Sequence, residues 1–322
     1  MAAGNAMTGQ HYAVDQTKGT VIAVAGERRK RPHHFEKDKK GNAKTSKTSS
    51  ASSCPFCRGC ERETPTANIE RPKGNWRVRS FENKYPFFSP KFNFNPLIDN
   101  SPGFGKHEVI VETPNHGEQF EQFTKDQLRL IFEAYVNRFT AISNIPNITF
   151  TYLFRNHGRE GGATIAHEHA QLVGLPFIPE IPRREMEHFE SYRREKGKCF
   201  YCEMASKKEN KIFENRDFVC VRPSFARFAL ECWIIPKKHI ADFTALDKKQ
   251  AENMMLALKE ITRRLKKSTE NYNVAFHCSA KKRKIHFHIE VYPKTDVLAG
   301  MELGTGLIGN PRSVKDALKA LR

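Results

Sequence analysis

The sequence predicts a fold of two similar halves, each combining strands with a long helix. The metal-type residues Cys54-x-x-Cys57, His116 and His167-x-His169 recur in the same order as Cys199-x-x-Cys202, His239 and His286-x-His288. Other landmarks repeat between them, such as Phe81-Glu82-Asn83-Lys84 and Phe213-Glu214-Asn215-Arg216. A single set can arise by chance, but two sets in one order indicate a duplication of one ancestral unit.

Matching elements follow these landmarks along the chain. Residues 20–25 alternate like a strand, and a helix is expected over 126–139, after His116. A second helix is expected over 247–266, after His239, with Asp247 as its N-cap. Each half then ends in alternating, strand-like residues that carry the H-x-H motif. Further helices are expected over 183–196 and 313–321.

Changes in composition predict the domain boundaries. Residues 1–17 are expected to form a flexible tail. The N-terminal half spans 18–176 and contains a Lys/Ser/Thr/Gly-rich segment, 36–53, that is typical of a mobile loop. A proline-rich connector over 177–197 leads into the C-terminal half, 198–322.

Composition and charge narrow the classes of function. The chain has 322 residues, and no apolar stretch approaches the roughly 20 residues that span a bilayer. The start lacks the apolar region of a signal peptide, so the eight Cys favour metal ligation in a reducing, cytoplasmic compartment over disulfides. The net charge of +18 favours polyanionic partners, either nucleotides and sugar phosphates or nucleic acid. The run 281–284 also resembles a nuclear-localisation signal, but it leads into a strand and is interpreted as a loop.

The first H-x-H motif carries the chemistry. On a strand, alternate residues share a face, so His167, His169 and Gln171 are expected to point the same way. One His can hold a metal while its neighbour faces an open site, where an unprotonated imidazole can attack phosphorus. The Gly161-Gly162 turn ahead of it can present backbone N–H groups to a phosphate. Alternatively, both His residues are zinc ligands and neither reacts.

The ordered landmarks over residues 21–311 resemble the galactose-1-phosphate uridylyltransferase family, a branch of the histidine-triad superfamily. Singly these motifs are modest signals, and their common order makes the resemblance specific. They are Arg28-Arg29-Lys30-Arg31-Pro32, Cys54-Pro55-Phe56-Cys57, Phe81-Glu82-Asn83-Lys84-Tyr85-Pro86, Gly105-Lys106-His107-Glu108-Val109, Thr113-Pro114-Asn115-His116, Asn156-His157-Gly158, His167-Glu168-His169-Ala170-Gln171 and His286-Phe287-His288.

The resemblance implies an α+β fold in which duplicated histidine-triad-like halves, antiparallel sheets with packed helices, form one continuous sheet. It also implies ping-pong transfer, in which His169 attacks the α-phosphorus of a nucleotide sugar and Gln171 stabilises charge on the phosphoryl oxygens. The nucleotide contacts implied by family position are Arg28, Arg31, Asn83, Asn156 and Thr164. The implied structural zinc ligands are Cys54, Cys57, His116 and His167.

A second metal site is open to two interpretations. Some family members hold a metal on one Glu and three His, which here correspond to Glu185, His277, His286 and His288. Others, including a plant adenylyl-transferring relative, use a second two-Cys, two-His set. The internal repeat favours that set here, with two zinc ions in all, on Cys199, Cys202, His239 and His286. Cys60 also forms a C-x-x-C with Cys57, which leaves the first Cys pair open to reassignment.

Several residues depart from the family pattern. Glu168 stands where the family has Pro and adds negative charge, which strand alternation predicts to face away from the phosphate. Ala170 replaces a residue that is often Gly or Ser. The late glycine-rich segment carries Met301 instead of the aromatic of galactose 1-phosphate binders, and it resembles the ADP-sugar phosphorylase branch.

The predicted function is uridylyl transfer from UDP-glucose to a hexose 1-phosphate, with adenylyl transfer from an ADP-sugar to phosphate as the alternative. A non-catalytic, zinc-stabilised nucleotide or RNA-binding module and a histidine-triad hydrolase are the other classes. The expected partners are a nucleotide sugar and a sugar 1-phosphate or phosphate, rather than nucleic acid or a membrane. Close relatives are often dimers, so the resemblance allows a homodimer.

Overall fold

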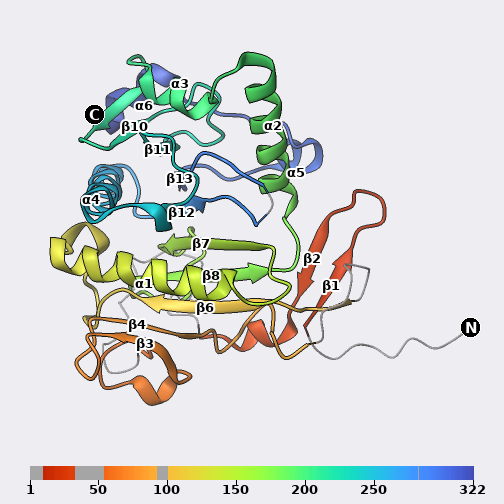
Figure 1. Cartoon of the computed structure of the whole chain (residues 1–322), viewed down its shortest axis with the longest axis vertical. Coiled ribbons are helices and arrows are strands. Elements are labelled where there is room, and N and C mark those ends of the chain that lie inside the picture. The colour runs from red at the N-terminus through yellow and green to blue at the C-terminus, as the bar shows by residue number, and fades with distance from the viewer. Residues whose placement is uncertain (1–9, 33–53, 93–100, 282) are drawn as a thin grey trace, which may run out of the picture.

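A ten-stranded antiparallel sheet forms the centre of the computed structural model, which describes residues 10–32, 54–92, 101–281 and 283–322 (Figure 1). The strand order is β3-β4-β6-β8-β7-β12-β13-β11-β10-β9. The first half contributes β3 (Ala67–Arg71), β4 (Val78–Glu82), β6 (Lys106–Val111), β7 (Phe150–His157) and β8 (His169–Leu175). The second half contributes β9 (Lys211–Glu214), β10 (Phe218–Val221), β11 (Cys232–Pro236), β12 (Tyr272–His277) and β13 (His288–Pro293).

The sheet is symmetric about the pairing of β7 with β12. This β7–β12 pairing is the seam between the two halves. Outward from the seam, the strands on one side are β8, β6, β4 and β3, and they correspond to β13, β11, β10 and β9 on the other. At the seam Asn156 lies opposite Asn273. Each H-x-H motif has its second His at the start of the corresponding strand, His169 in β8 and His288 in β13. The predicted fold class, an α+β fold of two duplicated halves in one continuous antiparallel sheet, is confirmed.

Two long helices lie over the same face of the sheet (Figure 1). The first, α1 (Lys125–Ser143), follows β6, and the second, α4 (Lys248–Leu265), follows β11. Thr124 caps α1 through its hydroxyl, and Asp247 caps α4 in a capping box, as the sequence predicted for the second helix. Because Ala170 and Leu172 face these helices, the alternating residues of β8 face the other side of the sheet.

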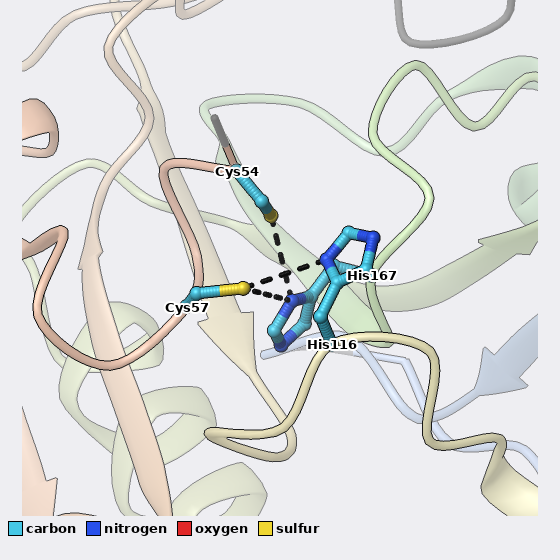
Figure 2. A group of neighbouring side chains, drawn as sticks. All are labelled: Cys54, Cys57, His116 and His167. Atoms are coloured by element: carbon cyan, nitrogen blue, oxygen red, sulfur yellow. Dashed lines mark hydrogen bonds between the residues drawn. The ribbon is translucent and has the colours of Figure 1, made fainter. Parts of the chain in front are cut away.

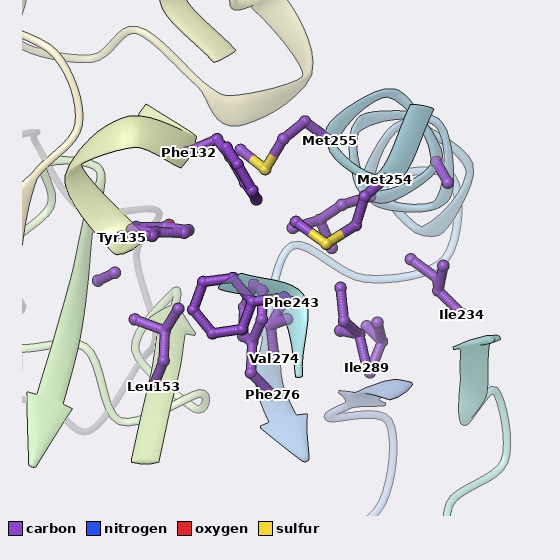
Figure 3. Packing of buried hydrophobic residues seen from close by; sticks show 14 of the residues in the cluster. Phe132, Tyr135, Leu153, Ile234, Phe243, Met254, Met255, Val274, Phe276 and Ile289 are labelled. Carbon is purple, nitrogen blue, oxygen red and sulfur yellow. The ribbon is translucent and has the colours of Figure 1, made fainter. Parts of the chain in front are cut away.

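The main core is shared by the two halves. Phe243, which lies between β11 and α4, contacts Phe139 of α1 and Phe276 of β12, with ring centroids 5.0 and 5.7 Å apart. Figure 3 shows Phe132 and Tyr135 of α1 facing Met254 and Met255 of α4 above these rings. The halves therefore cannot separate without exposing one continuous apolar cluster.

The shorter elements surround the sheet. A three-stranded sheet pairs β1 (His11–Val14) with β2 (Val21–Val24) and β5 (Ser101–Pro102). The remaining helices are α2 (Glu180–Lys196), α3 (Phe200–Ser206), α5 (Gly300–Thr305) and α6 (Val314–Leu321), and the short 3-10 turns are η1 (Gly26–Lys30), η3 (Glu61–Glu63), η4 (Phe120–Gln122) and η5 (Phe243–Ala245).

The predicted flexible tail over 1–17 is wrong where the structure describes it. Residues 11–14 form β1, because Tyr12 is buried and its hydroxyl donates to the Phe104 carbonyl at 2.6 Å. Residues 1–9 and the predicted mobile loop 36–53 lie outside the described residues. The helices expected at 183–196 and 313–321 correspond to α2 and α6. No helix in the described ranges has the length and apolarity that a bilayer crossing requires.

Candidate active site and metal centres

A pocket of about 710 Å³ opens on the face of the sheet opposite α1 and α4. A row of residues across four neighbouring strands lies along it. Phe81 of β4 pairs with Val109 of β6. Val109 pairs in turn with Gln171 of β8, and Gln171 pairs with Phe154 of β7. All four line the pocket, so the register of the first half positions its apolar floor with one carboxamide in the middle.

The structure brings together all seven residues that were predicted to bind or react with the nucleotide. Every one of them lines this single pocket, although they come from segments up to 143 positions apart, from residue 28 to residue 171. Their individual roles remain predictions. They are Arg28, Arg31, Asn83, Asn156, Thr164, His169 and Gln171.

His169 presents a bare ring nitrogen to the pocket. Its Nδ1–H donates to the backbone carbonyl of His167 at 2.7 Å. In a neutral imidazole the other nitrogen then carries the lone pair, so Nε2 is the nucleophilic atom. Burial lowers the pKa of His169, with the hydrogen bond to His167 opposing it, and thereby favours the neutral ring.

Basic side chains surround the pocket. Arg28, Lys30, Arg31, Arg62 and Lys84 all line it. Burial and repulsion from a neighbouring arginine lower the pKa of Arg28 to about 10, which still leaves it protonated at neutral pH. Two adjacent cations held in a half-buried pocket form a binding site for the negative charges of phosphates. The charge of this site supports a phosphorylated ligand.

The glycine turn before the H-x-H motif differs from the prediction. The Gly162 N–H donates to the Arg159 carbonyl at 2.9 Å, and the Ala163 N–H donates to the Gly158 carbonyl at 3.1 Å. These two amides stabilise the turn itself, so they are not presented to a phosphate as the sequence predicted. Thr164 follows the turn and lines the pocket, where its hydroxyl is available instead.

Glu168 points away from the pocket, as strand alternation predicted. Its carboxylate contacts Arg155 Nη2 at 2.5 Å and His157 Nδ1 at 2.8 Å, on the α1 side of the sheet. Arg155 also forms a bidentate contact with Glu112, which accepts a hydrogen bond from Tyr135. Although burial opposes ionisation, His157 and Arg155 lower the pKa of Glu168 to about 2. Its negative charge is therefore neutralised inside the protein rather than directed at the pocket.

Cys54, Cys57, His116 and His167 form the first metal-type cluster (Figure 2). The Cys57 sulfur lies 3.4 Å from His116 Nδ1, and the Cys54 sulfur lies 3.5 Å from His167 Nδ1. A zinc ion with ordinary bond lengths separates tetrahedral sulfur and nitrogen ligands by about 3.5 Å. His167 Nε2–H donates to the Thr113 carbonyl at 2.8 Å, which leaves its Nδ1 lone pair directed at the sulfurs.

Two further observations show that this donor set fits zinc. Burial and the neighbouring Cys54 together raise the pKa of Cys57 to about 12, so two thiolates here require a cationic partner. Burial also lowers the pKa of His167 to about 4, which keeps the ring in the neutral form that binds metals. Cys60, which competes with Cys54 for the C-x-x-C pair, lines the pocket and is not a member of the cluster.

The second cluster repeats the first. His286 Nδ1 lies 3.3 Å from the Cys199 sulfur and 3.4 Å from the Cys202 sulfur, and His239 Nδ1 lies 3.6 Å from Cys202. These distances fit the same tetrahedral zinc geometry. The position of His286 distinguishes the two interpretations of the second site. Its ring lies with the two cysteines, which favours the two-Cys, two-His set.

The other members of the alternative set form a third, hydrogen-bonded cluster. Glu185 contacts His277 Nδ1 at 2.7 Å and His288 Nε2 at 3.2 Å, and Glu290 contacts the same His288 nitrogen at 3.2 Å. Tyr201 donates a hydrogen bond to Glu185 at 2.6 Å. Although burial opposes protonation, the hydrogen bonds that His288 donates to Glu185 and Glu290 raise its pKa to about 10. The cluster is therefore a buried set of compensated charges.

Sequence reasoning missed several pocket residues. Phe56, Arg62, Phe87 and Phe154 all line the pocket without having been singled out for it. Phe154 could have been found from strand alternation, since it lies two residues before Asn156 on the same face of β7. Arg62 and Phe87 lie outside regular strands, so no periodicity in the sequence indicates where they point.

Two family models together match almost the whole chain. The N-terminal domain of galactose-1-phosphate uridyl transferase matches residues 3–179, and the C-terminal domain of the same family matches residues 185–312. The boundary between them falls next to α2, which connects the two halves of the sheet.

Similar proteins come from plants and bacteria. The ADP-glucose phosphorylase of Arabidopsis thaliana is 32% identical over 324 residues, which cover 96% of this chain and 91% of that protein. A galactose-1-phosphate uridylyltransferase of Thermotoga maritima is 26% identical and covers 83% of this chain and 88% of its own. A crystal structure of an Arabidopsis ADP-glucose phosphorylase with bound ADP-glucose matches with a TM-score of 0.79 and 29% identity, covering 98% of this chain and 99% of that chain.

Proposed function

The chain belongs to the galactose-1-phosphate uridylyltransferase family, and we propose that His169 transfers a nucleotidyl group from a nucleotide sugar through a covalent intermediate. As a member of this family it is a nucleotidyltransferase of the uridylyltransferase type. The observation that carries the proposal is the hydrogen bond from His169 Nδ1–H to the His167 carbonyl, because it leaves Nε2 unprotonated at the edge of a basic pocket.

The reaction follows as two displacements at one phosphorus. The Nε2 lone pair attacks the α-phosphorus, the bond from that phosphorus to the bridging oxygen breaks, and the sugar 1-phosphate leaves with the electron pair. An oxygen of the acceptor phosphate then attacks the same phosphorus, and the electron pair of the phosphorus–nitrogen bond returns to His169. Little covalent chemistry remains for the protein, so positioning and charge stabilisation dominate.

The surrounding residues supply that stabilisation. Arg28 and Arg31 provide positive charge for the phosphates, while Asn156, Thr164 and Gln171 provide hydrogen-bond donors on the same side of the sheet. Asn83 lies beside the apolar floor, where a nucleoside can contact it. These roles follow the family positions of the matched motifs and their common location in the pocket.

The two-Cys, two-His clusters support two structural zinc ions. In the first site, Cys54, Cys57, His116 and His167 would hold the ion, which supplies a rigid crosslink between separate loops. His167 precedes the nucleophile by two residues, and its carbonyl accepts a hydrogen bond from His169 Nδ1–H. This crosslink therefore fixes the orientation of the nucleophilic ring. Cys199, Cys202, His239 and His286 would do the same for the second half.

Two donors are supported by different observations. The family models and the Thermotoga relative support UDP-glucose, with uridylyl transfer to a hexose 1-phosphate in galactose metabolism. The second candidate is adenylyl transfer from ADP-glucose to phosphate. It is favoured by the 32% identity that extends over 96% of this chain and by the solved relative with bound ADP-glucose.

Trapping the intermediate tests both donors. Purified protein is incubated with UDP-glucose or ADP-glucose labelled at the α-phosphorus and quenched in base, which preserves phosphohistidine. We expect a labelled protein with one donor, no label in His169→Ala, and full label in His188→Ala, whose side chain is exposed on α2. Label retained in His169→Ala contradicts the proposal.

The products separate the remaining classes of function. Adding a hexose 1-phosphate or inorganic phosphate to the labelled protein should release a new nucleotide sugar or a nucleoside diphosphate. Release of nucleoside monophosphate alone indicates a hydrolase. Binding without any label, with an affinity for single-stranded RNA that falls steeply with salt, indicates a nucleic-acid-binding module instead.

A further inference from the structure

His107 is buried beside Gln171, which lines the pocket, although His107 does not react with anything in the proposed mechanism. Val109 of β6 pairs with Gln171 of β8, so His107, two residues earlier on the same face, is its diagonal neighbour. His107 Nε2 lies 3.0 Å from Gln171 Oε1. The ring is buried and stacks on Phe87, with the two ring planes 10° apart.

The hydrogen-bond pattern of the ring decides which nitrogen carries its proton. The backbone N–H of Phe87 points at His107 Nδ1, with a nitrogen–nitrogen distance of 3.2 Å. A backbone amide can only donate, so Nδ1 must accept and cannot be protonated. Burial and the charge of Arg28 lower the pKa of His107 to about 3, so at neutral pH the ring has a single proton. That proton is therefore on Nε2.

One contact favours the opposite tautomer, but its donor is a side chain rather than a backbone amide. Asn83 Nδ2 lies 3.1 Å from the same Nε2, and its Oδ1 already accepts from the Tyr85 backbone N–H at 2.9 Å. Two donors thus face each other at this point. Moving the proton to Nδ1 would relieve this contact but would leave the Phe87 amide facing a second donor, which costs about 1–3 kcal/mol. Asn83 lines the pocket and can direct its hydrogens at a ligand, whereas the Phe87 backbone cannot turn.

The tautomer fixes the direction of the Gln171 side chain. A protonated Nε2 requires an acceptor, so Oε1 of Gln171 must face His107 and its NH₂ group faces away from it. With the other tautomer the amide would rotate, and a carbonyl oxygen would meet the negative phosphoryl oxygens. We propose that His107 is a positioning residue that holds the NH₂ group of Gln171 toward the reacting phosphate. This inference rests on the proposed function.

The second pocket carboxamide is oriented in the same way from the C-terminal half. Asn273 of β12 donates to the Gly161 carbonyl at 2.5 Å, so its NH₂ group is on that side. The same NH₂ group lies 2.8 Å from the side-chain oxygen of Asn156, which must therefore be the acceptor. The NH₂ group of Asn156 is then free to face the pocket. The seam between the halves thus places a positioning residue of one half beside the site of the other.

A double-mutant cycle tests the role of His107. His107→Met keeps most of the volume and removes the donor, whereas His107→Gln keeps a donor near the position of Nε2. The measurement is the single-turnover rate of adduct formation with whichever donor labels the wild type. We expect His107→Met to slow it on the order of 100-fold and His107→Gln to recover most of that loss. In a Gln171→Met background, His107→Met should have no further effect.

The outcomes distinguish the failure of this inference from the failure of the proposed function. Equal slowing by His107→Met in both backgrounds means that His107 acts independently of Gln171, and it overturns the inference. An unchanged rate in His107→Met overturns it as well. Absence of label in the wild type overturns the proposed function, and the inference with it. If His107→Met does not fold, as judged by thermal melting, the same cycle is run with His107→Gln, whose smaller loss of rate should likewise disappear in the Gln171→Met background.

Discussion

Replacing Glu168 by Gln should destabilise the protein without placing any change in the pocket. Glu168 is 7% exposed, and its carboxylate contacts Arg155 and His157 on the α1 side of the sheet. The substitution keeps the shape of the side chain and removes its charge. Arg155 retains its bidentate contact with Glu112, so the cation is not left alone. The loss is therefore that of one charged partner from a buried network.

The magnitude follows from the shift in the pKa of Glu168 from 4.5 to about 2. Each pKa unit corresponds to about 1.4 kcal/mol, so ionised Glu168 contributes on the order of 3 kcal/mol at neutral pH. Because the folded-state pKa is the lower one, this stability is present above pH 4.5 and is lost as the pH falls toward 2. Between pH 7 and about pH 3.5 the contribution should fall by roughly 1.5 kcal/mol.

Urea unfolding of wild type and Glu168→Gln at both pH values measures this directly. We expect a difference in the free energy of unfolding of about 3 kcal/mol at pH 7 that narrows by about half at pH 3.5. Protonation of metal ligands at low pH affects both proteins and cancels in the difference. A difference below about 1 kcal/mol at pH 7, or one that widens in acid, refutes the reasoning. Adduct formation at His169, measured on the folded variant, should stay within a few-fold of wild type.

Three further predictions follow from other parts of the structure. Cys57→Ser should lower the zinc content from two ions to one per chain by elemental analysis, while Cys60→Ser, its neighbour outside the cluster, leaves it at two. Between pH 7 and 5 the free energy of unfolding should fall by about 2 kcal/mol less in His107→Gln than in wild type. The folded-state pKa of His107, about 3, lies below the ordinary 6.5, so wild-type stability is lost as protons bind the unfolded chain. An equal fall in both proteins contradicts the lowered pKa of His107. Phe276→Ala should cost about 3–5 kcal/mol in urea unfolding, since this ring is 1% exposed and packs on Phe243.

The duplication and most of the site could be predicted because their signals depend on residue type and order alone. Metal-type residues at repeated spacings identified two equivalent halves, and strand alternation correctly placed Glu168 on the side opposite Gln171. The N-cap at Asp247 was likewise readable from its side chain and the run that follows it. Such features need no knowledge of which strands pair.

Features that depend on strand register or on long-range contacts could not be predicted. Residues 11–14 lack a strong periodic pattern, and they form β1 because Tyr12 reaches Phe104, 92 residues away. The glycine turn before Thr164 uses its own N–H groups, which depends on backbone geometry that the letters Gly161-Gly162 do not specify. His107 was noted only as part of a motif, because its contact with Gln171 depends on how β6 pairs with β8.

The duplicated halves share one hydrogen bond from a histidine ring to the backbone, but the two rings lie in different chemical environments. His169 and His288 occupy equivalent positions, and each uses Nδ1–H to donate to the carbonyl two residues earlier, at 2.7 and 3.0 Å. What differs is the environment of Nε2. In the first half it faces the basic pocket, whereas in the second it lies 3.2 Å from both Glu185 and Glu290, whose hydrogen bonds raise the pKa of His288 to about 10 against the effect of burial. A protonated Nε2 has no lone pair, so this environment disfavours His288 as a nucleophile. The repeat therefore predicts where the second imidazole lies, and the two carboxylates give its Nε2 an environment unlike that of the proposed nucleophile.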